Sequence, residues 1–355
     1  MWFNDLDQIK CDTLLHAAKR AGLTTAVSSW PMTSGGEEFI DYLYPNVLDF
    51  YFEGIEEDIL GVYRSLGAGD NVIDIIEENN KIYGHNDRHP SGDYKQFAIG
   101  AEIIKRYKPG LLLMHPGNVD AARHKDGVHG EHVKNALREI DEMLGRLLDA
   151  VREAGIEELT DIVLLSDHGQ IGVTRMISPN VYLRNAGYIT LGEAGELKEW
   201  SAFAKQSGGS AQVYLKDPDN KEVFDGVYKL FSDMASEGIY GFERVLTAEE
   251  ARREFGLYGG FSFVLETDGY TGFSERLVGA PAKSFDFGDY TLGRGKHGHM
   301  PNKGPQPVFI AKGPSFKKNV IIPRGNILNH AATLAAALGV ELLDSEGSAV
   351  REILE

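Results

Sequence analysis

Three short polar clusters lie where apolar, strand-like runs of this sequence end or resume. Their members are Asp120 and His124, Asp167 and His168, and His297 and His299. Carboxylates and imidazoles are the oxygen and nitrogen ligands that suit Zn²⁺ or a similar divalent cation. Each cluster alone has a simpler interpretation: a surface loop, a capping Asp beside a packed His, or a solvated loop. Together they predict a metal site.

Two cations at such a site could serve phosphoryl transfer. In that reaction negative charge develops on the attacking and the leaving oxygens together, and two ions roughly 3.5–4 Å apart can stabilise both. The formal net charge of the chain is −17, so bound cations would have to reverse the local sign before an anionic ester could bind. The same acidic excess argues against nucleic acid as a bulk partner.

The elements that must position these clusters alternate between amphipathic helices and apolar strands. We predict helices over 94–106 and 133–151, and strands over 24–30, 111–114 and 161–166. Apolar runs between amphipathic helices indicate buried parallel strands covered on both faces. The sequence therefore predicts an α/β fold with a doubly wound, mostly parallel sheet sandwiched by helices.

The clusters and the first helix have predicted places in this fold. In open parallel sheets ligands bind beyond the carboxyl ends of the strands, so the loops after 111–114 and 161–166 should face one crevice.

Asp12 is positioned to cap the first helix.

A different pattern begins near residue 201, where shorter strands and helices follow one another, and the main pattern returns with an apolar run at 307–311. We therefore predict a main α/β core over 1–200, a small α+β cap insertion over 201–294 and a return to the core over 295–355.

Composition excludes several classes of protein. No apolar run approaches the roughly 20 residues that a membrane helix needs. The single cysteine, Cys11, excludes an internal disulfide and a thiolate metal cluster. A reducing compartment fits this usage, although a secreted protein can also lack disulfides, and we predict a cytoplasmic location. The first ten residues show neither the basic start nor the apolar core of a signal peptide.

Four runs of the sequence resemble the type I phosphodiesterase/nucleotide pyrophosphatase family of the alkaline phosphatase superfamily. They are TLLHAAKRAGLTTAVSSWP, NVDAARHKDG, VLLSDHGQ and GKHGHMPNKGPQPVFIAKGPSF. The resemblance implies an alkaline-phosphatase-like fold with a small cap and two zinc ions, with manganese as the alternative metal. It also implies hydrolysis of a small phosphodiester or pyrophosphate substrate of the nucleotide type through a phosphorylated Thr or Ser.

The resemblance also assigns the ligands by motif. Asp120, His124 and His297 would hold one ion, and Asp167 and His168 the other. His299 would be a neighbour of these ligands or a contact to the substrate.

The sequence departs from the family pattern at its start. The family has a further metal-binding Asp at the end of a first strand and a nucleophilic Thr or Ser opening the next helix, both upstream of TLLHAAKRAG. Only ten residues precede Cys11, and they contain neither Thr nor Ser. Thr33 and Ser34 are interpreted as turn residues.

The nucleophile is therefore not identified in this sequence. We expect a truncated chain that hydrolyses substrates weakly or not at all and binds its second metal weakly. The competing explanation is a diverged protein that uses metal-bound water in place of a protein nucleophile. Loss of a central strand would expose backbone and apolar surface, which predicts either marginal stability or a homo-oligomer.

Two alternative functions stay open. One is a phosphonoacetate-type hydrolase of the same superfamily, and the cap would decide between phosphodiester and phosphonate substrates. The other is a non-catalytic binding or scaffold remnant, which would have no reason to keep tight metal at Asp120, His124 and His297.

Overall fold

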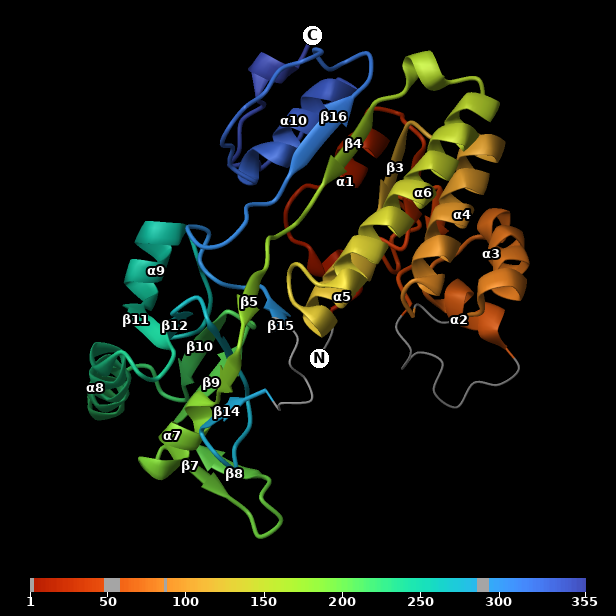
Figure 1. Cartoon of the computed structure of the whole chain (residues 1–355). Coiled ribbons are helices and arrows are strands. Elements are labelled where there is room, and N and C mark those ends of the chain that lie inside the picture. The colour runs from red at the N-terminus through yellow and green to blue at the C-terminus, as the bar shows by residue number, and fades with distance from the viewer. Residues whose placement is uncertain (1–2, 48–57, 86–87, 286–293) are drawn as a thin grey trace. The chain divides into compact units, whose positions relative to one another are not determined.

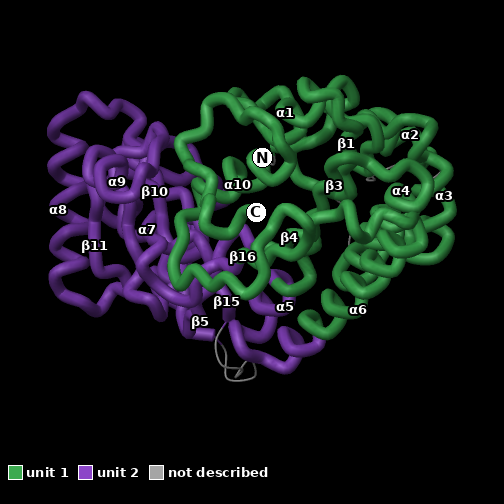
Figure 2. The backbone as a smooth tube through the Cα atoms, turned by 90° about the horizontal axis from the view of Figure 1, so that it is seen from above, with its two compact units in different colours: residues 1–119, 136–165, 309–355 green, residues 120–135, 166–308 purple. Residues whose placement is uncertain are grey.

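The computed structural model describes residues 3–47, 58–85, 88–285 and 294–355 (Figure 1). By their contacts they form two compact units (Figure 2): unit 1 is 1–119, 136–165 and 309–355, and unit 2 is 120–135 and 166–308. Within the described ranges, no helix combines the length and the apolar character needed to cross a bilayer.

Unit 1 contains a parallel sheet in the order β2-β1-β3. Its strands are β1 (Thr25–Ser28), β2 (Tyr42–Tyr44) and β3 (Leu111–Met114). The remaining elements that lie wholly in unit 1 are η1 (Leu6–Gln8), α1 (Leu14–Arg20), α2 (Ile59–Ser65), α3 (Asp70–Tyr83), α4 (Ser91–Tyr107), η3 (Glu157–Leu159), β4 (Ile162–Leu165), β16 (Phe309–Lys312), α10 (Leu328–Leu338) and η5 (Arg351–Ile353).

Alternate residues of this sheet enter two different hydrophobic clusters. Ala26 and Leu112 pack in the cluster that holds the apolar residues of α2, α3 and α4. Val27 and Leu113 pack in the cluster that holds Leu15 of α1. Because successive side chains of a strand point to opposite faces, helices cover both faces of the sheet. The predicted α/β class is confirmed.

The predicted buried parallel strand at 161–166 is wrong in direction and in burial. Within the part of the chain that the structure describes, β4 pairs only with β16, and the pairing is antiparallel. Every residue of β4 is at least partly exposed, with Leu164 at 39%. An apolar run of this length indicates a strand but specifies neither its direction nor how far it is covered.

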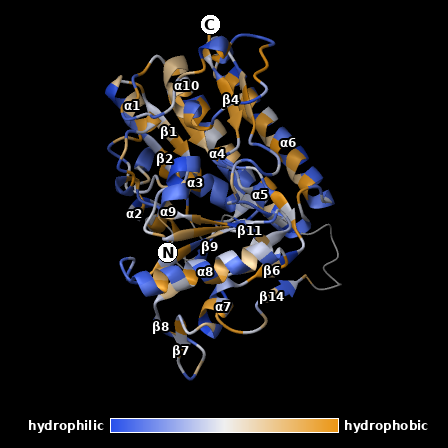
Figure 3. Cartoon of the chain, turned by 90° about the vertical axis from the view of Figure 1, so that its left-hand side faces the viewer, coloured by the Kyte–Doolittle hydropathy of each residue, from blue (hydrophilic) through white to orange (hydrophobic). Residues whose placement is uncertain are grey.

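The long helix α6 (Glu131–Glu153) confirms the amphipathic pattern predicted over 133–151. Hydrophobic and hydrophilic residues alternate along it in Figure 3. Its buried Ala150 and Val151 share a cluster with Leu112 of β3 and Ile162 of β4. The homo-oligomer expected from exposed apolar surface stays a prediction, although Ile310 of β16 is 58% exposed.

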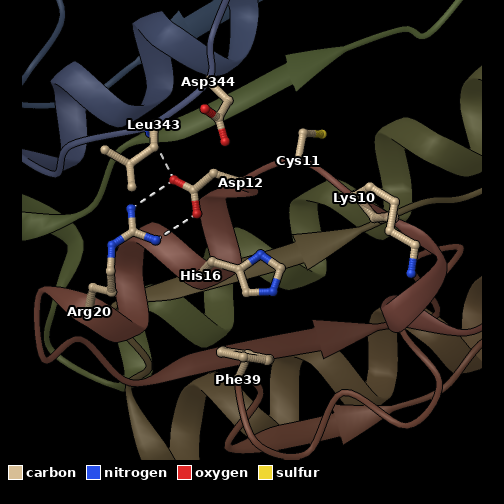
Figure 4. Close-up of a pocket in the computed structure, with 9 residues that line it drawn as sticks. Lys10, Cys11, Asp12, His16, Arg20, Phe39, Leu343 and Asp344 are labelled. Carbon is tan, nitrogen blue, oxygen red and sulfur yellow. Dashed lines mark hydrogen bonds and ion pairs between the residues drawn. The ribbon is translucent and has the colours of Figure 1, made fainter.

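Asp12 does not cap the first helix, so that prediction is wrong. Thr13 does: its hydroxyl accepts from the backbone N–H of His16 at 3.3 Å. Asp12 instead forms two hydrogen bonds with the Arg20 guanidinium, at 2.6 and 2.7 Å. It also accepts from the backbone N–H of Leu343 at 2.8 Å (Figure 4). Asp12 therefore ties the start of unit 1 to its C-terminal segment.

Unit 2 contains a four-stranded antiparallel sheet in the order β11-β12-β10-β9. Its strands are β9 (Ala202–Gln206), β10 (Ser210–Leu215), β11 (Phe242–Thr247) and β12 (Phe263–Thr267), and its helices include α8 (Lys221–Glu237) and α9 (Ala248–Phe255). The α+β pattern predicted after residue 201 is present.

Further short elements of unit 2 were not predicted. They are β5 (Ile171–Val173), β6 (Arg175–Ile177), α7 (Pro179–Asn185), β7 (Ile189–Leu191), β8 (Leu197–Trp200), β13 (Thr271–Phe273), β14 (Ala282–Ser284) and β15 (Arg294–Lys296). The contact-based units do not decide where a cap would begin, so the division at 200 and 294 stays a prediction.

We predict that Asp12→Asn lowers the free energy of unfolding at pH 7 by about 1 kcal/mol, a modest amount because Arg20 lies partly in solvent. The hydrogen bond from Arg20 lowers the pKa of Asp12 in the folded state. The contribution is therefore fully present above the unfolded-state pKa and is lost as the pH falls through the folded-state pKa.

Urea denaturation of both proteins, from pH 7 down to below the folded-state pKa of Asp12, measures the difference in the free energy of unfolding. Asp344→Asn, at the edge of the same pocket, is the control. Equal stability of Asp12→Asn and the unsubstituted protein at pH 7 would contradict the role of Asp12.

Candidate metal centre

Asp120 and His124 lie on a helix, not in the predicted loop. Helix α5 (Asn118–Asp126) places them one turn apart, and residues at i and i+4 share a helix face. Asp120 Oδ2 lies 3.3 Å from His124 Nε2. The backbone N–H groups of Gly117 and Asn118 donate to Asp93 Oδ1 at 2.8 and 3.2 Å, which satisfies donors that the start of a helix leaves free.

Asp167 and His168 lie immediately after β4, as the sequence predicts. Asp167 Oδ2 lies 3.4 Å from His168 Nε2, and the backbone N–H of His168 donates to Asp167 Oδ1 at 3.0 Å. A Cβ at Gly169 would lie 1.9 Å from the carbonyl oxygen of Pro305. Only glycine permits that approach, so Gly169 holds the Asp-His turn against the segment that follows His297.

His297 follows β15, which pairs antiparallel with β5. Its ring stacks on the His168 ring, with centroids 3.9 Å apart and planes 18° apart. The His124 ring lies 5.2 Å away, and Asp120 Oδ1 lies 3.9 Å from His297 Nε2. The structure thus brings all five predicted ligands into one contiguous cluster within unit 2.

The tightest part of this cluster fits a divalent cation. Asp120, His168 and His297 each offer a ligand atom, and these three atoms lie within 4.8 Å of one another. One carboxylate with two imidazoles is a donor set that zinc accepts. This group contains His168 in place of the predicted His124, so the division of the five ligands between two ions stays a prediction.

A backbone carbonyl orients His124 for the same purpose. His124 Nδ1 lies 2.8 Å from the carbonyl oxygen of Gly295. A proton on Nδ1 donates to this oxygen, so Nε2, which donates to Asp120 when protonated, is the nitrogen that would lose its proton to bind a cation. Hydrogen bonds of this kind fix the tautomer and ring orientation of metal-binding histidines.

Asp120 and His297 already have the protonation states that a cation needs, whereas His124 must lose a proton to bind one. Burial acts to raise the pKa of Asp120, but the hydrogen bond from His124 and the nearby imidazoles lower it overall. The hydrogen bond with Asp120 raises the pKa of His124. Burial, with help from the charge of His168, lowers the pKa of His297. At neutral pH the carboxylate is ionised and His297 is neutral, as a ligand must be.

Two further residues belong to the surroundings of the cluster. His299 Nε2 lies 3.1 Å from the carbonyl oxygen of Lys303, and its role beside the ligands or the substrate stays a prediction. Gln170 was missed: it is 2% exposed, and its side-chain amide donates to Asp120 Oδ1. Its position directly after Asp167-His168-Gly169 was the one signal in the sequence.

We predict that His297→Ala weakens zinc binding by about 100-fold or more, because loss of a direct ligand should exceed the roughly 10–100-fold effect of losing an outer partner. Competition with a chromophoric chelator measures the affinity. His132→Ala is the control, since His132 Nδ1 lies 3.2 Å from Asp126, a residue outside the cluster. Zinc affinity unchanged by His297→Ala would remove this residue from the centre.

Comparison with known proteins gives a consistent result. The model of the family described as type I phosphodiesterase/nucleotide pyrophosphatase matches residues 2–257. Ectonucleotide pyrophosphatase/phosphodiesterase 1 of Saccharomyces cerevisiae is 25% identical over 236 residues, which cover 62% of this chain and 30% of the yeast protein. Family member 1 of Homo sapiens is 23% identical over 178 residues, 49% of this chain and 15% of the human protein.

The fold is similar to a solved structure, that of human ectonucleotide pyrophosphatase/phosphodiesterase 5. The TM-score is 0.59 at 18% sequence identity, covering 96% of this chain and 74% of that one. This likeness confirms the predicted alkaline-phosphatase-like fold class. The chain spans under a third of the length of the curated relatives it matches.

Proposed function

Because this chain belongs to the type I phosphodiesterase/nucleotide pyrophosphatase family, we propose that it serves metal-dependent hydrolysis of phosphodiester or pyrophosphate bonds. The proposed substrates are small phosphoesters of the nucleotide type. The observation that carries the proposal is the convergence of Asp120, His168 and His297 on one point.

The proposed centre uses five side chains of unit 2. Asp120, His124 and His297 would hold one divalent ion, and Asp167 and His168 the other. Two such ions, zinc in our proposal with manganese as the alternative, would stabilise negative charge on both the attacking and the leaving oxygens. The two carboxylates offset part of the cationic charge, and the Gly295 carbonyl keeps His124 in the ligand tautomer.

The proposal assigns no nucleophile. Thr33 and Ser34 are each 1% exposed. The Thr33 hydroxyl donates to the carbonyl oxygen of Trp30 at 2.6 Å, and the Ser34 hydroxyl accepts from Asn4 Nδ2 at 2.8 Å. These contacts support their interpretation as structural turn residues. We therefore propose that turnover by this chain is slow.

The test combines ligand binding with turnover. Zinc-loaded protein should bind adenosine monophosphate in a calorimetric titration and hydrolyse bis(p-nitrophenyl) phosphate slowly. Chelation should abolish both, and so should Asp167→Ala. Asp225→Ala, on the exposed face of α8, should change neither.

Two results would contradict the proposal. Turnover that survives both chelation and Asp167→Ala would place the activity outside this centre. Absence of both nucleotide binding and turnover in zinc-loaded protein would favour a non-catalytic scaffold.

A further inference from the structure

We propose that Gln170 is a positioning residue that fixes the Asp120 carboxylate for metal binding. The inference rests on the proposed metal centre and extends it to a side chain that is not itself a ligand. It concerns how the carboxylate is held before a cation arrives.

Gln170 reaches Asp120 directly. It lies between the Asp167-His168 turn and β5, and its Nε2 donates to Asp120 Oδ1. An ionised carboxylate only accepts hydrogen bonds, so the amide nitrogen, not the amide oxygen, must face it. The other carboxylate oxygen, Oδ2, lies 3.3 Å from His124 Nε2. Each oxygen of Asp120 thus has its own neighbour, which fixes the rotation of the carboxylate about its last bond.

The β5–β15 pair is shaped to admit this amide. A Cβ at Gly295 would lie 2.3 Å from Gln170 Oε1 and 2.7 Å from the carbonyl oxygen of Arg123. Glycine is therefore required where β15 passes the amide. The carbonyl of the same Gly295 holds His124 Nδ1 at 2.8 Å. The two residues of α5 are thus oriented by Gln170, which precedes β5, and by Gly295 of β15.

The burial of Gln170 is hard to explain by stability alone. Its Oε1 is buried, and among the described residues it has no hydrogen-bond partner. Burial of an amide oxygen without a partner is unfavourable, and an apolar side chain of similar size would avoid that penalty. The hydrogen bond that the amide donates to the Asp120 carboxylate explains why an amide occupies this position.

The neutrality of the amide also suits this role. A Lys or Arg at this position would donate to Asp120 as well, but its charge would compete with and repel the incoming cation. A neutral donor orients the carboxylate and leaves its full negative charge to the metal.

Two substitutions test the inference, with zinc affinity as the readout. Gln170→Leu removes the donor, and Gln170→Asn shortens the side chain by one methylene so that the donor no longer reaches Asp120. We expect each to raise the zinc dissociation constant about 10–100-fold, the usual effect of losing an outer partner of a metal ligand. The metal-free melting temperature of Gln170→Leu should stay within a few degrees of that of the unsubstituted protein.

Gln96→Leu is a closely matched control. Gln96 is 3% exposed, its Nε2 donates to the carbonyl oxygen of Ser28 at 2.8 Å, and its Oε1 is also buried without a partner among the described residues. Gln96 lies in unit 1, whereas the metal centre lies in unit 2. The Gln96→Leu protein should therefore bind zinc with unchanged affinity, even if its free energy of unfolding falls.

The outcomes separate the inference from the proposed function. Unchanged zinc affinity in both Gln170 variants would overturn the role of Gln170 and leave the metal centre standing. An equal loss in Gln96→Leu would show a general effect of buried glutamines and would also overturn it. Absence of zinc binding by the unsubstituted protein would overturn both proposals.

Discussion

The ionised carboxylate of Asp120, half buried among three imidazoles, is the interaction on which the candidate centre depends. A carboxylate removed from water is unfavourable unless it is paired and hydrogen-bonded. Here His124, His297 and the Gln170 amide surround it. The same arrangement lowers the pKa of Asp120 and so keeps a negative charge ready for a cation. The neighbouring residues act by orienting that charge or by adding further donors to it.

Five candidate ligands could be named from sequence because they lie in short motifs that resemble those of the family; the structure brings their side chains together, and their binding of metal stays a prediction. Asp120 and His124 are separated by one helical turn, and Asp167 and His168 are adjacent. Their secondary structure was harder to predict. The segment of α5 is mostly polar and lacks an apolar face, so it resembles a loop. Its first turn is stabilised by Asp93, a side chain supplied from the preceding helix α4.

Features that depend on distant pairing could not be predicted. Gln170 contacts Asp120 across 50 residues of sequence, and no local pattern reports that contact. The direction of β4 depends in the same way on β16. The cap of the first helix was also not predictable from local sequence, because Asp12 and Thr13 are both residue types that cap helices. Arg20 and the Leu343 backbone N–H bind Asp12, and Thr13 is the cap. The α/β class, in contrast, was predictable because apolar runs between amphipathic helices indicate strands that are covered on both faces, as β1 is.

Anomalous diffraction at the zinc absorption edge, from crystals grown with zinc, tests the centre most directly. We predict two peaks roughly 3.5–4 Å apart, in contact with the side chains of Asp120, His124, Asp167, His168 and His297. Peaks that contact other residues while these five side chains bind none would contradict it.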